Sequence, residues 1–152
     1  MDLFAWKDGY ATGYTPIDNQ HRYFLALINK LISYRDRDRV VLGSLLEEVV
    51  LYAVFHFRSE ENGMLVHGYE TKVAEQHIKD HGALLRQVRV MADRYSQDDI
   101  TLQEVILFLL KWFSVHTTEE DRPLGAFLAG CKTNAWQTHE LPMRFGKPGD
   151  VG

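Results

Sequence analysis

The sequence predicts an all-α protein, an antiparallel up-down four-helix bundle with an N-terminal aromatic arm and a C-terminal tail. Four stretches repeat apolar residues at the period of an amphipathic helix. Short polar or glycine-containing connections separate these stretches, which favours antiparallel neighbours. A parallel sheet would need strand-like runs between the helices, and the sequence contains no such runs.

Length and composition fit one globular domain of 152 residues, with an arm over 1–15, a bundle over 16–128 and a tail over 129–152. A net charge of −4 gives no basic surface, so nucleic acid is not an expected partner. The N-terminus lacks the pattern of a secretory signal, and no apolar run is expected to span a membrane. Cys131 is the only cysteine, which excludes an intramolecular disulfide and favours a cytoplasmic location.

The first helix is expected to begin at Thr15 and to fade in the charged run over 35–39. Thr15 is expected to cap the helix, and Pro16 suits its first turn. His21 shares the apolar face of this helix, so we expect it to point into the core. The arm before the helix is rich in aromatic residues and is expected to pack as a hydrophobic lid.

The second helix is expected over about 40–66, with Gly68 as its stop. Ser44 and Glu47 have the spacing of a capping box, which would place the start later. One face of this helix combines apolar residues with two metal-ligating types, and its members are Val49, Ala53, His56, Glu60 and Met64.

The third helix is expected over about 70–95. Its inward face is expected to hold two histidines among apolar residues, namely Val73, His77, His81, Leu84, Leu85, Val88 and Met91.

The fourth helix is expected to start near Thr101, where Glu104 completes a capping box. It carries His116 on its apolar face. Pro123 removes a backbone donor and restricts the residue before it, so the helix should end or distort around Asp121. In the tail, Trp136, Leu141 and Phe145 are candidates to anchor the chain across the bundle.

Five imidazoles and two carboxylates lie on or next to the apolar faces of these four helices: His21, His56, Glu60, His77, His81, His116 and Asp121. Burying each of them alone would be costly, which favours a shared metal site. Residues four apart lie on one helix face, so His56 with Glu60, and His77 with His81, can each reach one point. The five-residue spacing of the last pair turns their side chains about 140° apart on an ideal helix, so both reach one site only where the helix is distorted.

Seven ligands are too many for one tetrahedral zinc ion. Two ions that share two bridging carboxylates and an oxo or hydroxo group would use them all. Three histidines would then complete one ion, and two would leave the other with a vacancy. The remaining histidines, His67 and His139, are expected at the surface.

With these motifs the chain resembles the hemerythrin family, and within it the bacterial members, over roughly 4–128. The matching stretches are IDNQH at 17–21, HFRSEE at 56–61, GY at 68–69, HIKDH at 77–81 and WFSVH at 112–116, with Asp121.

The resemblance implies a non-haem di-iron centre that cycles between Fe2+ and Fe3+ with a bridging oxo or hydroxo group. His77, His81 and His116 would hold the six-coordinate iron, while His21 and His56 would hold the five-coordinate iron. Glu60 and Asp121 would bridge the two. In the family, O2 binds at the vacancy, takes two electrons from the iron pair and accepts the proton of the bridging hydroxide.

The pocket for O2 is expected to be lined by Phe24, Trp112 and Phe113, apolar neighbours that would exclude water and protons. Phe113 stands where a leucine is common in the family, and Thr117 replaces a usual isoleucine. Pro123 follows Asp121 closely, and the tail is longer than the family core needs. These departures bear on oxygen affinity and autoxidation rather than on metal binding.

Three functions are compatible with such a site. The first is reversible O2 binding without catalysis, for storage, transport or delivery to an oxygen-consuming enzyme. The second is sensing of O2, nitric oxide or redox state through a signalling partner. The third is a di-iron oxidase, peroxidase or nitric oxide scavenger, which needs a proton donor at the vacancy; Tyr14 and Tyr23 are the candidates. Iron storage would call for more carboxylates.

Overall fold

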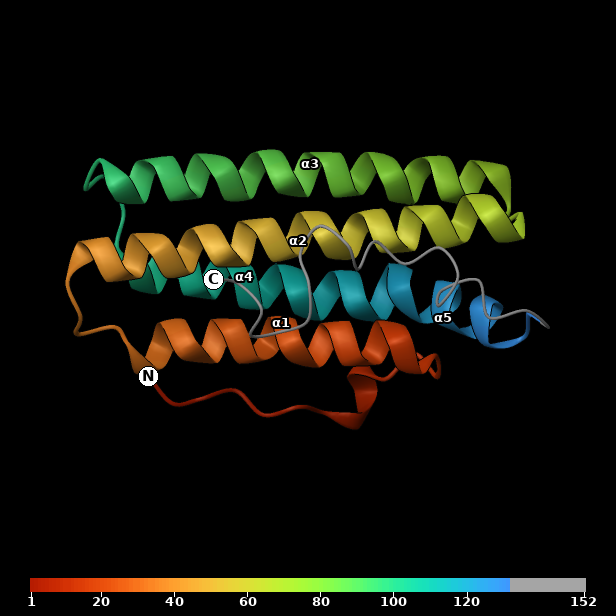
Figure 1. Cartoon of the computed structure of the whole chain (residues 1–152), viewed down its shortest axis with the longest axis horizontal. Helices are drawn as coiled ribbons and strands as arrows, with labels where there is room; N and C mark the ends of the chain where they lie inside the picture. The colour runs from red at the N-terminus through yellow and green to blue at the C-terminus, as the bar shows by residue number, and fades with distance from the viewer. Residues whose placement is uncertain (132–152) are drawn as a thin grey trace.

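The computed structural model describes residues 1–131, and over this range the chain folds into an antiparallel four-helix bundle, which confirms the predicted fold class (Figure 1). The predicted tail anchors Trp136, Leu141 and Phe145, and also His139, lie outside the described residues. The helices are α1 (Thr15–Ser33), α2 (Arg39–His67), α3 (Thr71–Ser96), α4 (Leu102–His116) and α5 (Arg122–Ala129), with a π-helical segment, η2 (Thr117–Asp121), between α4 and α5.

Helix α1 begins at Thr15 as predicted, but Thr15 does not cap it. Tyr14 occupies the N-cap position and makes no side-chain cap hydrogen bond. The buried carboxylate of Asp18 instead accepts hydrogen bonds from the backbone N and the hydroxyl of Thr12, both at 2.8 Å. A carboxylate in the first turn also interacts favourably with the helix dipole, so this contact fixes both the helix start and the arm.

Helix α2 starts at Arg39 because Asp38 caps it, accepting a hydrogen bond from the backbone N of Val41 at 3.0 Å. The alternative start at Ser44 is therefore wrong, and Ser44 is an exposed residue inside the helix. Gly68 ends the helix as predicted, in the left-handed conformation at φ 67° that glycine adopts at low cost.

The expectation that no apolar run could span a membrane needs correction for α2. By length and composition alone, α2 is apolar enough to cross a bilayer, with a mean hydropathy of 1.7 in its most apolar window. Half of that window is buried inside the bundle. The apolar character of α2 is thus accounted for by core packing, since the helix also carries the buried polar residues His56 and Glu60.

Helix α3 is capped by Glu70, whose carboxylate accepts hydrogen bonds from the backbone N of Lys72 and of Val73. Val73 is 47% exposed, so its predicted place on the inward face is wrong. Val73 is the third residue of α3, so it lies in the first turn, at the end of the helix, where its side chain is not covered. The rest of the predicted face is buried or half-buried.

Helix α4 has the predicted capping box between Thr101 and Glu104. After His116 the backbone widens into the π-helical segment η2, and Pro123 then lies in the first turn of α5, where its missing N–H costs nothing. The predicted distortion around Asp121 is therefore confirmed, and the chain continues as a helix beyond it.

The arm lies along α1 and is held by polar contacts as well as by its rings (Figure 1). The side-chain amide of Asn29 pairs with both backbone groups of Phe4 at 2.8 Å. Further along, Thr12 fills the space beside Gly125 of α5, where an added Cβ would lie 2.3 Å from the Thr12 Cβ. The arm is therefore a packed part of the domain that joins α1 to α5.

Replacement of Gly125 by alanine should push Thr12 away from α5 and lower the free energy of unfolding by about 1–3 kcal/mol, as overpacking does. Gly43 offers a matched control, since it also lies in a helix and an added Cβ there meets nothing within 4 Å. The Gly43→Ala variant should be more stable by about 0.5–1 kcal/mol. Urea unfolding measures both; equal effects of the two substitutions would contradict this packing.

Candidate metal centre

The seven predicted ligands form one polar layer between two apolar clusters. On α1, His21 lies between Ile17 of the smaller cluster and Phe24 of the larger one. On α2, Glu60 lies in the same way between Met64 and Phe57. All seven side chains are at most 5% exposed, so the layer is shut off from bulk water.

The structure brings all seven predicted residues together, and it divides them into two overlapping groups. In each group the ligating atoms lie within 4.8 Å of one another. The larger group has three histidines and the smaller has two, and both carboxylates belong to both groups. Their members are Glu60, His77, His81, His116 and Asp121, and His21, His56, Glu60 and Asp121.

Glu60 turns one carboxylate oxygen to each histidine group. Its Oε1 lies 3.0 Å from the Nε2 of His56, in the smaller group. Its Oε2 lies 3.1 Å from the Nε2 of His81 and 3.4 Å from that of His77, in the larger group.

Asp121 does the same from the opposite side of the bundle. Its Oδ2 lies 2.9 Å from the Nε2 of His21, and its Oδ1 lies 3.0 Å from that of His77 and 3.2 Å from that of His116. Two carboxylates arranged in this way are placed to bridge two metal ions.

The π-helical segment explains how Asp121 reaches the site. A π-helix accommodates an extra residue in one turn, so a five-residue spacing brings side chains to one face. His116 ends α4 and Asp121 ends η2, and both are buried. The conflict between the spacing and an ideal α-helix is thus resolved by the backbone at the site itself.

The residues present fit a metal pair. Over residues 1–131, the four carboxylate oxygens of Glu60 and Asp121 and the Nε2 of His77 are buried and make no hydrogen bond of regular geometry. The carboxylate oxygens instead converge with the imidazole nitrogens of the same cluster. Ligand atoms that converge in this way without regular hydrogen bonds fit bound ions. Imidazole nitrogen with carboxylate oxygen is a donor set typical of iron, zinc and related ions. His67 lies outside both groups, at the end of α2.

In the absence of metal, the histidines and the two carboxylates shift each other's pKa values. Burial acts to lower the pKa of the histidines, but the two carboxylates outweigh it and raise the pKa of His56 and His77 to about 9 and that of His116 to about 10. Burial acts to raise the pKa of Glu60 and Asp121, but the histidines hold both well below their usual values. Metal binding must therefore displace protons from the imidazoles.

Three further side chains hold the outer nitrogens of the ligand histidines. Gln20 lies 2.6 Å from the Nδ1 of His56. Sequence analysis did not single this residue out, although it immediately precedes His21.

Glu61 contacts the Nδ1 of His81 at 3.0 Å, and Glu120 contacts the Nδ1 of His116 at 2.7 Å. Neither glutamate was predicted from the sequence to take part in the site. The four-residue spacing of His116 and Glu120 on one helix is the one sequence feature that could have predicted such a contact to an outer nitrogen.

Aromatic rings wall the site, and the three predicted pocket residues are among them. Phe113 packs edge-on against His21 at 5.7 Å, and Trp112 stacks on His116 at 5.6 Å. Phe24 contacts both of these rings. Phe57, which sequence analysis did not single out, stacks on His81 with 4.0 Å between ring centres.

The two tyrosines proposed as proton donors have other neighbours. Tyr23 packs against Tyr52 at 4.5 Å, and Tyr14 packs against the smaller apolar cluster. The tyrosine that reaches the wall is Tyr10 of the arm, 5.2 Å from Phe113.

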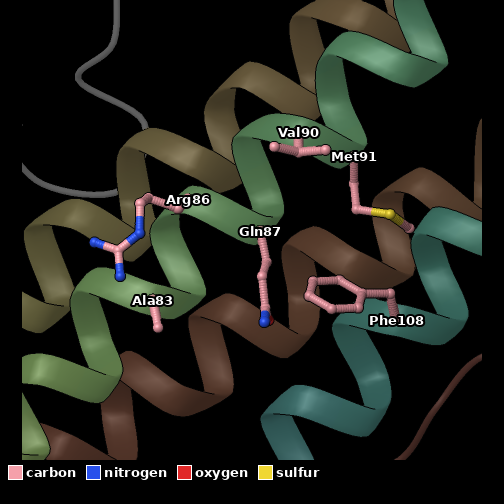
Figure 2. Close-up of a pocket in the computed structure, with 6 residues that line it drawn as sticks. All are labelled: Ala83, Arg86, Gln87, Val90, Met91 and Phe108. Atoms are coloured by element: carbon pink, nitrogen blue, oxygen red, sulfur yellow. The ribbon is translucent and has the colours of Figure 1, made fainter.

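A surface groove of about 460 Å³ runs between α3 and α4 and extends to the outer side of His116. Trp112 and Glu120 line it there. Figure 2 shows a neighbouring pocket that shares Ala83, Gln87 and Phe108 with this groove. His116 of the larger histidine group therefore borders this groove.

The helical bundle and its buried, carboxylate-bridged histidine layer define a class of non-haem metal-binding four-helix proteins. Residues 12–128 match the family model of the hemerythrin HHE cation binding domain. The chain therefore belongs to the hemerythrin family.

Several relatives carry the name bacteriohemerythrin. The one from Clostridium acetobutylicum is 32% identical over 130 residues, which covers 79% of this chain and 97% of the relative. The one from Stenotrophomonas maltophilia is 26% identical and covers 96% of this chain and all of the relative.

An animal relative and a crystal structure extend the likeness. Hemerythrin subunit alpha of Lingula anatina is 30% identical over 118 residues, which covers 78% of this chain and 89% of the relative. The crystal structure of a hemerythrin leucine-to-alanine mutant superposes with a TM-score of 0.76 at 25% identity, and covers 85% of this chain and 99% of that one.

The metal-free protein should lose stability as the pH rises from about 6.5 to about 10. The raised pKa values of His56, His77 and His116 mean that folding favours their protonated forms. This stabilisation is complete below the unfolded pKa of about 6.5 and is lost as the pH passes the folded values. Thermal unfolding of chelator-treated protein tests this, with metal-loaded protein as the control. A flat or rising melting temperature between pH 7 and 10 without metal would contradict it.

Proposed function

We propose that this protein binds O2 reversibly at a non-haem di-iron centre, for oxygen storage, transport or delivery, and that it is not an enzyme. The observation that carries the proposal is the division of the carboxylate oxygens of Glu60 and Asp121 between a three-histidine and a two-histidine group. Membership of the hemerythrin family supports iron as the metal.

The unequal histidine groups support ligand binding at one ion. With two shared carboxylates and a bridging oxo or hydroxo group, three histidines would complete six positions on one ion. His77, His81 and His116 would hold that ion. His21 and His56 would leave the other ion with one open position, and this ion is the proposed O2 site.

The walls of the site support reversible binding. Phe113 lies beside His21, and Phe24 stacks on Phe113 with 6.0 Å between ring centres. Apolar rings keep water and protons away from the open position, and both would otherwise promote loss of reduced oxygen and leave oxidised iron.

A binding role is favoured over a catalytic one by the position of Tyr10. An oxidase or peroxidase would need a proton donor at the open position. The ring of Tyr10 packs against Phe113, and Phe113 packs against His21. The Phe113 ring therefore separates Tyr10 from the histidine beside the open position. A sensor that acts through a separate signalling partner would use the same site.

The single cysteine supports a cytoplasmic location as part of this proposal.

Anaerobic reduction of the iron-loaded protein, followed by air and then by removal of O2, tests the proposal. A visible absorption band that appears with air and fades on deoxygenation is the expected result. Direct and lasting conversion to the ferric form, with no reversible band, would contradict reversible binding and favour a redox sensor or an oxidase.

Replacement of His77 or His116 by alanine should reduce iron loading below two ions per chain, because each change removes one Nε2 ligand and leaves unpaired buried carboxylate oxygens. Iron analysis of purified protein measures this. The matched control is His67→Ala, since His67 lies outside both ligand groups. Two irons per chain in the His77 and His116 variants would refute the ligand assignment.

The change of Phe113 to leucine should widen the wall beside His21 and raise the autoxidation rate about tenfold, because water gains access to the open position. The loss of the oxygenated absorption band with time measures this rate. Phe127→Leu is the control, because Phe127 packs against Tyr69 and the smaller apolar cluster. Equal rates in both variants and in the unaltered protein would show that Phe113 serves packing alone.

A further inference from the structure

We propose that Glu61 and Glu120 are positioning residues that lower the reduction potential of the iron held by His77, His81 and His116, while neutral Gln20 leaves the other iron easier to reduce. The two irons would thus differ in charge environment as well as in ligand number. This inference rests on the proposed di-iron function and assigns a role to three residues outside the ligand set.

The hydrogen bonds to the outer nitrogens differ between the two histidine groups. In the larger group, the Nδ1 atoms of His81 and His116 contact the carboxylates of Glu61 and Glu120. Both carboxylates are about a quarter exposed, at 27% and 24%, so water solvates their negative charge.

Among residues 1–131, no carboxylate contacts the outer nitrogens of the smaller group. The Nδ1 of His56 contacts the amide oxygen of Gln20, which is neutral. Over the same range, the Nδ1 of His21 is buried without a hydrogen-bond partner. The outer carboxylates that the structure describes therefore lie on the side of the larger group.

The direction of the effect follows from the tautomer. All five ligand histidines turn Nε2 towards the carboxylates at the centre, as the contacts of each ring show. With a metal on Nε2, Nδ1 keeps its proton and donates it outward. A carboxylate acceptor draws this proton more strongly than an amide and makes the imidazole a better electron donor. Better donors stabilise Fe3+ over Fe2+, which lowers the potential.

The order of reduction follows. One electron from a chemical reductant such as dithionite should convert the di-ferric pair to a mixed-valent pair with Fe2+ on the side of His21 and His56. A second electron should then reduce the iron of the larger group. The two steps therefore report on different outer residues.

Glutamine replacements test the charge while keeping the hydrogen bond. In Glu61→Gln and Glu120→Gln, the amide oxygen still accepts from Nδ1, so a purely structural role predicts no change. We expect the potential of the second reduction step to rise, with about a tenfold shift in the ferric-to-ferrous equilibrium, or ~59 mV for one electron. Gln20→Glu should lower the potential of the first step by a similar amount.

The control is Glu119→Gln. Glu119 lines the groove between α3 and α4 and is exposed, so its replacement removes an equal charge close to the site without removing a carboxylate from a ligand histidine. Potentials are measured by spectroelectrochemical titration after an iron count on each variant.

The outcomes separate the inference from the proposed function. Shifts in the stated directions, larger than that of Glu119→Gln, would support the inference. Two irons per chain with shifts no larger than the control in all three variants would overturn it and leave the di-iron proposal intact. Fewer than two irons in the unaltered protein would overturn both.

Discussion

Two buried carboxylates that each serve two sets of histidines are the constraint on which this structure depends. Glu60 comes from the C-terminal third of α2, and Asp121 comes from the end of η2, across the bundle. Their oxygens are buried among the imidazole nitrogens of the same cluster. Such a centre is costly to bury unless positive charge balances it. The raised pKa of His56, His77 and His116 supplies part of that charge, and bound metal ions would supply more.

The rest of the fold serves this layer. Apolar clusters close the bundle on both sides of it, and aromatic rings from α1, α2 and α4 wall it. The arm ties α1 to α5 through Thr12, Asp18 and Gly125, next to the helix turn that carries Asp121. The match to a cation binding domain supports metal binding at this layer. The outer contacts of this chain differ between the two histidine groups, with a carboxylate beside His81 and a neutral amide beside His56.

The sequence was sufficient to predict the bundle, the convergence of the seven side chains and the distortion near Pro123, because helical periodicity and side-chain chemistry act over a few neighbouring residues. It did not decide between a start of α2 near residue 40 and a later start at Ser44, and it did not identify Asp38 as the residue that caps the helix. The contacts of Gln20 and Glu61 depend on how helices are rotated against each other. Periodicity fixes that rotation only to within about a third of a turn.

X-ray absorption at the iron edge, with an iron count on the same sample, tests the central claim most directly. Bridging by Glu60 and Asp121 predicts two irons per chain, each with nitrogen and oxygen neighbours, and an iron–iron distance below about 4 Å. One iron per chain, or two irons with no iron–iron scattering at that range, would contradict the bridged pair.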